Sequence, residues 1–165
     1  MDCASALTGP ELGELLRKGH SSDPWYGPAT VECLATVTFS AAATRSYANA
    51  HTIWEIVLHM TAWQREVARR LSGLPPQAPA DGDWPTPPPP TEQAWASAQA
   101  DLRHTLESLA TLVTHLSAEE LQKPVGLTRD RALGSGVSTA QMVAGILQHN
   151  AYHSGQIALL AKSSR

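Results

Sequence analysis

Apolar residues recur along several stretches of this chain with the period of an α-helix. After Thr52 the repeating positions are Ile53, Val57, Met60, Gln64, Val67 and Leu71, of which only Gln64 is polar. After Thr91 they are Trp95, Leu102, Leu106, Leu109, Val113 and Leu116. Near the C-terminus they are Val143, Ile146, Leu147, Ile157 and Leu160. Positions three and four residues apart share one face of a helix, so each stretch predicts a helix with one buried face.

The expected helix starts carry capping boxes, in which Ser or Thr is followed three residues later by Glu or Gln. Such boxes begin at Thr8, Thr52, Ser117 and Ser138, and Thr91 is a further capping residue. The first box predicts a short helix that Gly19 closes, with an apolar face made by Leu12, Leu15 and Leu16. The box at Ser117 predicts one extra turn before Pro124, and residues 122–137 are expected to form a loop without a strand pair.

Another helix is predicted from Pro28 onward, because proline suits the first turn of a helix. Its apolar positions would be Val31, Leu34, Val37 and Ala41. Several β-branched residues in this stretch lower its helical propensity, but the alternation that a strand needs is also poor.

Residues 73–90 contain so many prolines that no regular element is expected, only a long extended connection. Trp84 lies in its middle, and a solvated linker gains nothing from a tryptophan, so we expect this side chain to pack against the body or over a cavity. Together the patterns predict an all-α fold: a four-helix bundle with a long Pro-rich connection and short extra helices, in one domain over residues 1–165.

Charge and composition exclude several classes of protein. The formal net charge is −3 and no basic run is longer than Arg69-Arg70, so nucleic acid is not an expected partner. The N-terminus lacks a basic segment followed by an apolar core, and polar residues interrupt the apolar stretch 142–160, so neither secretion nor membrane spanning is expected. The two cysteines, Cys3 and Cys33, have no metal-binding spacing, which favours a cytoplasmic location, with Cys33 as a small core residue.

The candidate chemistry lies in three of the seven histidines. His149 and His153 are four residues apart, so their rings project from one side of the last helix, on or beside its apolar stripe. His59 lies on the flank of the apolar stripe of another helix, where a side chain can line a cavity between helices. Three neutral imidazoles can hold a divalent cation and leave a fourth position open. The alternative is that protein groups satisfy these rings in the core or in a groove.

The remaining histidines are predicted to have no part in such a site. His104 and His115 face away from the leucine stripe of their helix and are expected in solvent, His20 is expected in a turn, and His51 just outside a helix cap.

Several motifs resemble those of the DinB/YfiT-like family of metal-dependent enzymes, and the likeness covers nearly the whole chain. Residues 24–28 (PWYGP) resemble the segment after the family's first helix, and residues 51–63 resemble its first metal motif with His59 at the ligand position. Trp84 amid prolines resembles the family's long second connection, and residues 149–157 resemble its second motif, with His149 and His153 as ligands.

The resemblance implies a four-helix bundle, often a homodimer, in which three histidines hold Zn²⁺, Ni²⁺ or a similar divalent ion. It also implies thiol-dependent chemistry, since the activities known in this superfamily include S-transfer of low-molecular-weight thiols and mycothiol-dependent isomerisation. The expected reactants are therefore a small electrophilic molecule and a low-molecular-weight thiol.

An open three-histidine site predicts a transferase or a hydrolase, because a cation can activate either a thiol or a water molecule. Gln156, one turn beyond His153, is a candidate to bind a ligand histidine or the substrate, or else a plain polar residue at the bundle edge. Glu55, one turn before His59, is a candidate base or orienting group, or else only part of its capping box. Trp63 is expected either to wall the cavity or to pack in the core. The rival prediction is a non-catalytic helical binding or stress-response protein whose metal is structural or absent.

Overall fold

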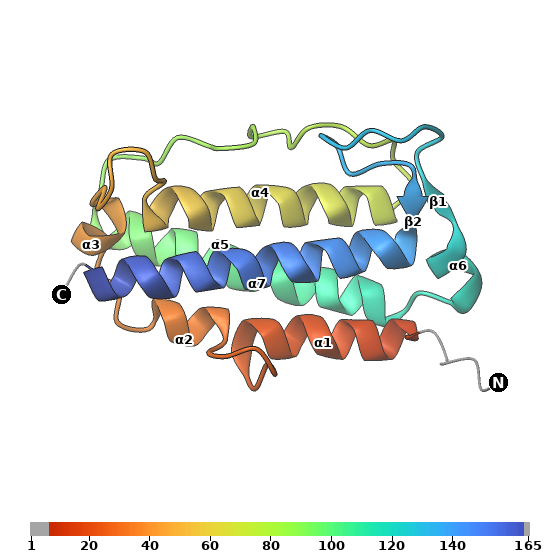
Figure 1. Cartoon of the computed structure of the whole chain (residues 1–165), viewed down its shortest axis with the longest axis horizontal. Helices are drawn as coiled ribbons and strands as arrows, with labels where there is room; N and C mark the ends of the chain where they lie inside the picture. The colour runs from red at the N-terminus through yellow and green to blue at the C-terminus, as the bar shows by residue number, and fades with distance from the viewer. Residues whose placement is uncertain (1–6, 164–165) are drawn as a thin grey trace.

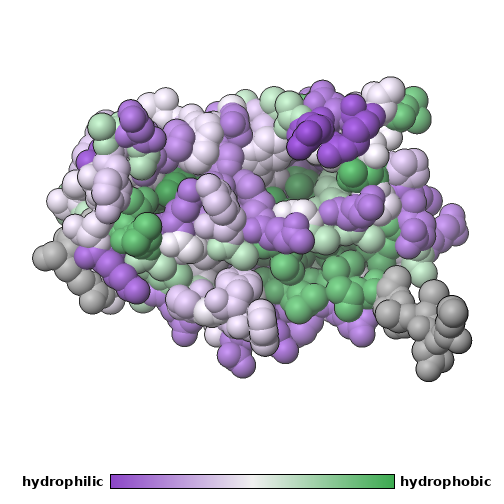
Figure 2. All heavy atoms as spheres, in the orientation of Figure 1, coloured by the Kyte–Doolittle hydropathy of each residue, from purple (hydrophilic) through white to green (hydrophobic). Residues whose placement is uncertain are grey.

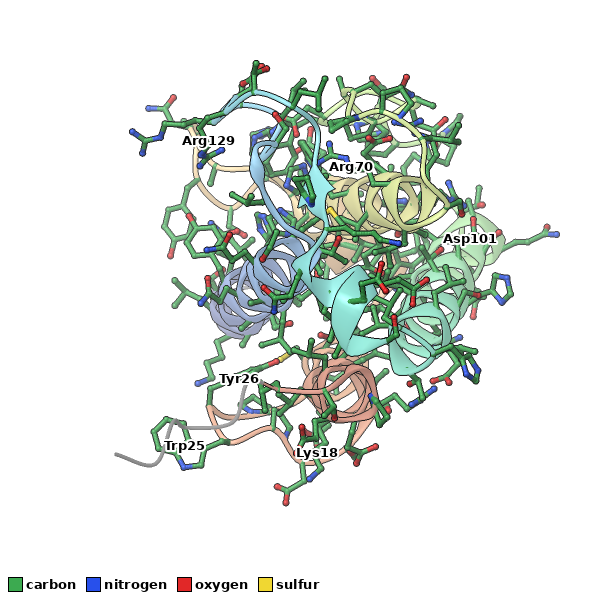
Figure 3. All side chains as sticks on the ribbon, turned by 90° about the vertical axis from the view of Figure 1, so that its right-hand side faces the viewer. Lys18, Trp25, Tyr26, Arg70, Asp101 and Arg129 are labelled. Atoms are coloured by element: carbon green, nitrogen blue, oxygen red, sulfur yellow. The ribbon has the colours of Figure 1, made fainter. Side chains whose placement is uncertain are left out.

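A computed structural model describes residues 7–163 of the chain, so Cys3 and the rest of the N-terminal segment lie outside the described residues. Within this range four helices of 13 to 25 residues form a bundle: α1 (Gly9–Ser21), α4 (Ile53–Leu71), α5 (Glu92–Thr114) and α7 (Thr139–Ser163). They lie along one long axis in Figure 1, and the end-on view of Figure 3 shows them around a common centre. The predicted all-α four-helix bundle is confirmed.

The bundle encloses an apolar core. At one end of it, Trp54, Val57 and Met60 of α4 pack with Leu102 of α5 and Ile157 of α7. At the other end the core consists of residues from α1, α4, α5, α7 and the segment after α5: Leu12, Leu16, Val67, Leu109, Ala110, Val113, Leu121, Val125, Met142, Val143 and Ile146. No helix in residues 7–163 is long and apolar enough to cross a membrane.

The capping residues predicted from the sequence begin the helices as expected. The Thr8, Thr52 and Ser117 boxes each have both of their hydrogen bonds, at the starts of α1, α4 and the short helix α6 (Ala118–Gln122). Ser138 and Gln141 form the same reciprocal pair at the start of α7. Thr91 accepts a hydrogen bond from the backbone N–H of Ala94. These bonds satisfy backbone donors that the first helical turn leaves unpaired, which is why they fix where each helix begins.

The helix predicted from Pro28 is wrong in its extent, because the structure divides it into α2 (Thr30–Leu34) and α3 (Phe39–Ala43). The break follows from two polar contacts, one local and one with a residue of α5. The Thr38 side chain caps α3, and the Val37 carbonyl accepts the indole N–H of Trp95 at 2.9 Å instead of an intrahelical bond. The first helix also continues two residues past Gly19, to Ser21.

The expectation of no strand pair is also wrong. β1 (Pro124–Val125) and β2 (Val137–Ser138) pair antiparallel, with Pro124 opposite Ser138, and they hold the ends of a loop formed by residues 126–136. Gly136 closes this loop with φ +69°, and a Cβ there would lie 2.5 Å from the Arg129 Cα. Strands of two residues are too short to show an alternating pattern, so the sequence carried no signal for them.

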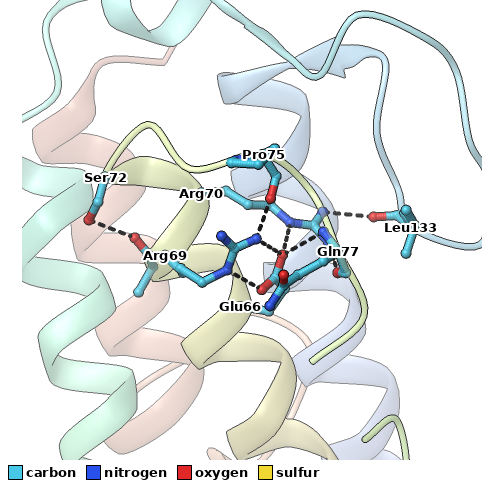
Figure 4. A network of polar contacts seen from close by, with 8 residues as sticks. Glu66, Arg69, Arg70, Ser72, Pro75, Gln77 and Leu133 are labelled. Carbon is cyan, nitrogen blue, oxygen red and sulfur yellow. Dashed lines mark hydrogen bonds and ion pairs between the residues drawn. The ribbon is translucent and has the colours of Figure 1, made fainter. Parts of the chain in front are cut away.

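A buried ion-pair network joins α4 to two irregular segments (Figure 4). The Glu66 carboxylate is 2.7 Å from the guanidinium groups of both Arg69 and Arg70 and also accepts the backbone N–H of Gln77. Arg70 in turn donates to the carbonyls of Leu133 and Gln77. Glu66 and Arg70 are only 3% and 7% exposed. The network therefore holds the Pro-rich connection and the 126–136 loop against the same end of α4.

Replacing Glu66 with alanine should lower the free energy of unfolding by about 3–5 kcal/mol, because it leaves the Arg70 charge buried without its partner. Urea denaturation followed by circular dichroism measures this change. The matched control is Glu107→Ala, which breaks a pair with Arg17 in which the Glu107 side chain is 60% exposed. The control should cost no more than about 1 kcal/mol. Equal losses in the two variants would contradict a structural role for the network.

Candidate metal centre

Helices α4 and α7 bring together the three histidines selected from the sequence. His59 comes from α4, and His149 and His153 come from α7, which packs beside it. One ring nitrogen of each residue lies within 4.8 Å of the others, and the His59 and His149 Nε2 atoms are 2.9 Å apart. His59 and His153 are buried and His149 is half-buried. These three side chains can therefore hold one metal ion between the two helices.

The outer ring nitrogens of His59 and His153 are held by carbonyl oxygens. The Nδ1 of His59 lies 2.6 Å from the backbone oxygen of Asp83, and the Nδ1 of His153 lies 2.6 Å from the side-chain oxygen of Gln156. The Gln156 amide is oriented in turn by donating to the Tyr152 hydroxyl. Because a carbonyl only accepts, each Nδ1 carries the proton and each Nε2 keeps a free lone pair. This is the arrangement that proteins use to orient histidines that bind a metal.

The geometry of His149 also fits a bound cation. Its Nδ1 is buried and has no hydrogen-bond partner, while its Nε2 faces the unprotonated Nε2 of His59. Two lone pairs at 2.9 Å repel each other unless a proton or a cation lies between them. Nitrogens that are each about 2.0–2.1 Å from one tetrahedral zinc ion lie about 3.3 Å apart, so this spacing is close to that of two zinc ligands. The residues present therefore fit a divalent metal.

Burial keeps the three rings neutral. It lowers the pKa of His149 to about 4, with the neighbouring imidazoles of His153 and His59 adding to the effect. It likewise lowers the pKa of His153 to about 4, although the Gln156 contact opposes it, and it lowers the pKa of His59 against the influence of Asp83. Neutral imidazole is the form that binds metals, so protons compete little for these nitrogens near neutral pH.

Trp84 covers the cluster, which confirms the expectation that it packs against the body. Its ring stacks on that of His59, with centroids 3.8 Å apart, and on that of His51 at 3.5 Å. The neighbouring Asp83 carboxylate accepts the indole N–H of Trp63 at 2.6 Å. The middle of the Pro-rich connection is therefore fixed over the histidines by both residues. Sequence reasoning missed the Asp83 contact, because only the tryptophan beside it signalled that this segment packs.

The sequence left two possible roles open for each of Gln156, Glu55 and Trp63, and the structure shows the contacts that each of them makes. Gln156 contacts His153, as proposed from its spacing. Glu55 completes the Thr52 capping box and pairs with Arg45, which is the second of the two roles predicted for it. Among the described residues it forms no hydrogen bond or ion pair with His59. Trp63 lines a cavity together with His149.

Two further side chains belong to the body of the protein. Cys33 is buried in the core, where burial raises the pKa of its thiol, so it is a poor nucleophile. The prediction for His20 is wrong, because it lies in the last turn of α1, buried, and burial lowers its pKa to about 4. His104 and His115 are exposed, as expected.

Comparison with known families gives a match over more than half of the chain. Residues 28–157 match the model of the DinB superfamily, and all three clustered histidines lie in this range. Neither a curated protein nor a solved structure matched the chain.

The stability of the metal-free protein should fall as the pH is lowered from about 6.5 toward about 4. The unfolded chain binds protons at histidine below the ordinary pKa of 6.5, whereas the folded chain does not bind them at His20, His149 and His153 until about pH 4, because burial lowers the pKa of each. Unfolding therefore takes up protons in this window, and stability is complete only above it. Melting temperatures between about pH 7 and about pH 5, measured with a chelator present, test this while most carboxylates stay ionised.

His149→Gln should flatten that pH dependence, because it removes one of the buried groups. His115→Gln, at an exposed position, is the control and should leave the slope unchanged. A melting temperature that is constant over this range in the unmodified chain would contradict the neutral, buried state of the histidines.

Proposed function

This chain belongs to the DinB superfamily, and on that premise we propose that it is a metal-dependent enzyme of the thiol S-transferase or hydrolase type. His59, His149 and His153 are the proposed metal ligands, and Zn²⁺ or Ni²⁺ is the proposed ion. The observation that carries the proposal is the convergence of three neutral imidazoles, two of which, His59 and His153, already have their outer nitrogens oriented by carbonyl oxygens. Within the described residues this group holds three ligands rather than the four of a closed structural site.

When bound, a divalent cation with an open position supplies Lewis acidity, which makes a thiol or a water molecule nucleophilic near neutral pH. The chain's own residues prepare the site for this chemistry. His59 donates its Nδ1 proton to the Asp83 carbonyl, and His153 donates its own to Gln156. These bonds hold both rings with their lone pairs directed inward.

The surroundings of the site support a small-molecule reactant. The stacked Trp84 ring shields His59 from water on one side. On another side, His149 forms part of the wall of a cavity of about 340 Å³, which is the size range of pockets for small ligands. We propose that the reactants are a small electrophile and, in the transferase case, a low-molecular-weight thiol. The homodimer, the single domain and the cytoplasmic location stay predictions.

Protein purified without an affinity tag should contain about one divalent ion per chain by elemental analysis, because three imidazoles bind such an ion at neutral pH. His153→Ala should remove it. Gln156→Ala should weaken metal binding by about 10–100-fold, since it takes away the group that orients His153. His115→Ala is the control, because its ring is exposed. A trace of metal that His153→Ala leaves unchanged would overturn the metal centre.

Metal-loaded protein should accelerate either the coupling of a thiol to a chromogenic electrophile or the hydrolysis of a chromogenic ester. A panel of low-molecular-weight thiols and a thiol-free arm separate the two chemistries. His59→Ala should abolish the acceleration, whereas His104→Ala, an exposed position on α5, should keep it. Rates equal to those of His59→Ala in every arm would leave the rival, a non-catalytic binding protein, as the better description.

A further inference from the structure

The cavity beside His149 is lined by apolar side chains from two helices and by basic side chains from the 126–136 loop. It lies where α4 and α7 face the 126–136 loop, and Trp63 and His149 form the part of its wall nearest the metal centre. Val67, Met142 and Ile146 supply apolar surface. Gly145 of α7 also lines it, and because a Cβ there would meet nothing within 4 Å, the missing side chain leaves the space open.

The loop side of this cavity is basic. Arg129 and Arg131 both line it, and neither forms an ion pair with a carboxylate among residues 7–163. Arg129 donates only to backbone carbonyls, those of Asp130 and Ser135. The Asp130 carboxylate accepts the backbone N–H groups of Ala132 and Leu133.

Arg70 differs from these two arginines because it contacts a carboxylate, that of Glu66, which it shares with Arg69. In Figure 3 Arg129 lies on the outer loop, whereas Arg70 extends from α4. Figure 2 shows the strongly hydrophilic surface of this loop, at the upper right, beside a hollow in which apolar atoms are visible. The two arginines of the lining that form no ion pair with a carboxylate among residues 7–163 therefore lie on the loop side of the cavity, while its apolar surface comes from α4 and α7.

We propose that this cavity binds a small organic carboxylate, which gives the substrate class of the function proposed above and rests on that function. The apolar body of the molecule packs against Val67 and Ile146. Its carboxylate meets Arg129 and Arg131, because a guanidinium matches the planar carboxylate with two parallel hydrogen bonds. The end of the molecule away from the carboxylate then faces His149 and the metal centre.

A pair of probes of nearly the same shape, one a charged carboxylate and one a neutral amide, tests the proposal: phenylacetate and phenylacetamide. Calorimetric titration of the full chain, treated with a chelator so that no metal can receive the carboxylate, should show phenylacetate binding at least about tenfold more tightly. The double variant Arg129→Gln, Arg131→Gln should remove the difference. Arg103→Gln, which removes a charge from the exposed surface of α5, should keep it. Equal affinities for the two probes in the unmodified chain would overturn the proposal.

Substitutions at two glycines of α7 test whether phenylacetate binds in this cavity. Gly145→Leu places a side chain in the cavity and should abolish binding of phenylacetate, while improving helix propensity. Gly155→Leu is the matched control, because a Cβ there also meets nothing within 4 Å and this position does not line the cavity. Unchanged binding in Gly145→Leu, in protein whose circular dichroism is normal, would place the carboxylate elsewhere and overturn the proposal.

The same experiments separate this proposal from the proposed function. If the chelator-treated chain binds phenylacetate, but the untreated protein holds no metal and accelerates no reaction, the cavity remains a binding site and the proposed enzyme function is wrong. Metal content and activity that depend on the histidines, without a difference between the two probes, would sink the carboxylate site alone.

Discussion

The stability of the structure depends on bonding partners for the polar side chains that are buried in the seam between α4 and α7. An apolar bundle would place Leu or Val at these positions, but here the seam contains His59, Gln64 and Asn150 together with the two histidines of α7. Gln64 donates to Asn150 across the seam at 3.2 Å, and the histidines meet ring to ring. Burying such groups without partners costs about 1–3 kcal/mol each, so the seam is stable only if something completes their bonding. The proposed metal ion would do this for the inner nitrogens of all three imidazoles at once.

The irregular segments supply further partners for the side chains of the seam. The Pro-rich connection brings the Asp83 carbonyl to His59 and the Trp84 ring over it, and the Glu66 network holds the beginning of the same connection at the far end of α4. Arg70 extends that network to the 126–136 loop through the Leu133 carbonyl. Both segments are therefore fixed to one helix. Their placement covers the histidines on one side and leaves a cavity beside His149 on another.

The buried histidines of this seam lower the stability of the protein in mild acid, although the proposed metal centre needs them. The lowered pKa values of His149 and His153 mean that the folded protein keeps these rings neutral at the expense of stability in mild acid. The same neutrality frees the lone pairs that a metal needs. A core without these histidines would be less sensitive to pH, but it would lack the side chains of the proposed metal centre. A site that weakens the empty fold and is completed by an ion is the pattern expected of a functional centre.

The sequence by itself determined the helices, because caps and apolar periodicity act within a few residues, as the bonded boxes at Thr8, Thr52, Ser117 and Ser138 show. It also selected the three histidines, through helical spacing and the resemblance of their motifs. Only the tertiary structure decided which groups surround them. His59 and Asp83 are 24 residues apart in the chain. Their contact uses a backbone carbonyl of the Pro-rich connection, which has no periodic sequence pattern. The β1–β2 pair and the cavity under the basic loop likewise arise from contacts between segments, which no local pattern encodes. The break between α2 and α3 combines the local Thr38 cap with the distant contact of Trp95.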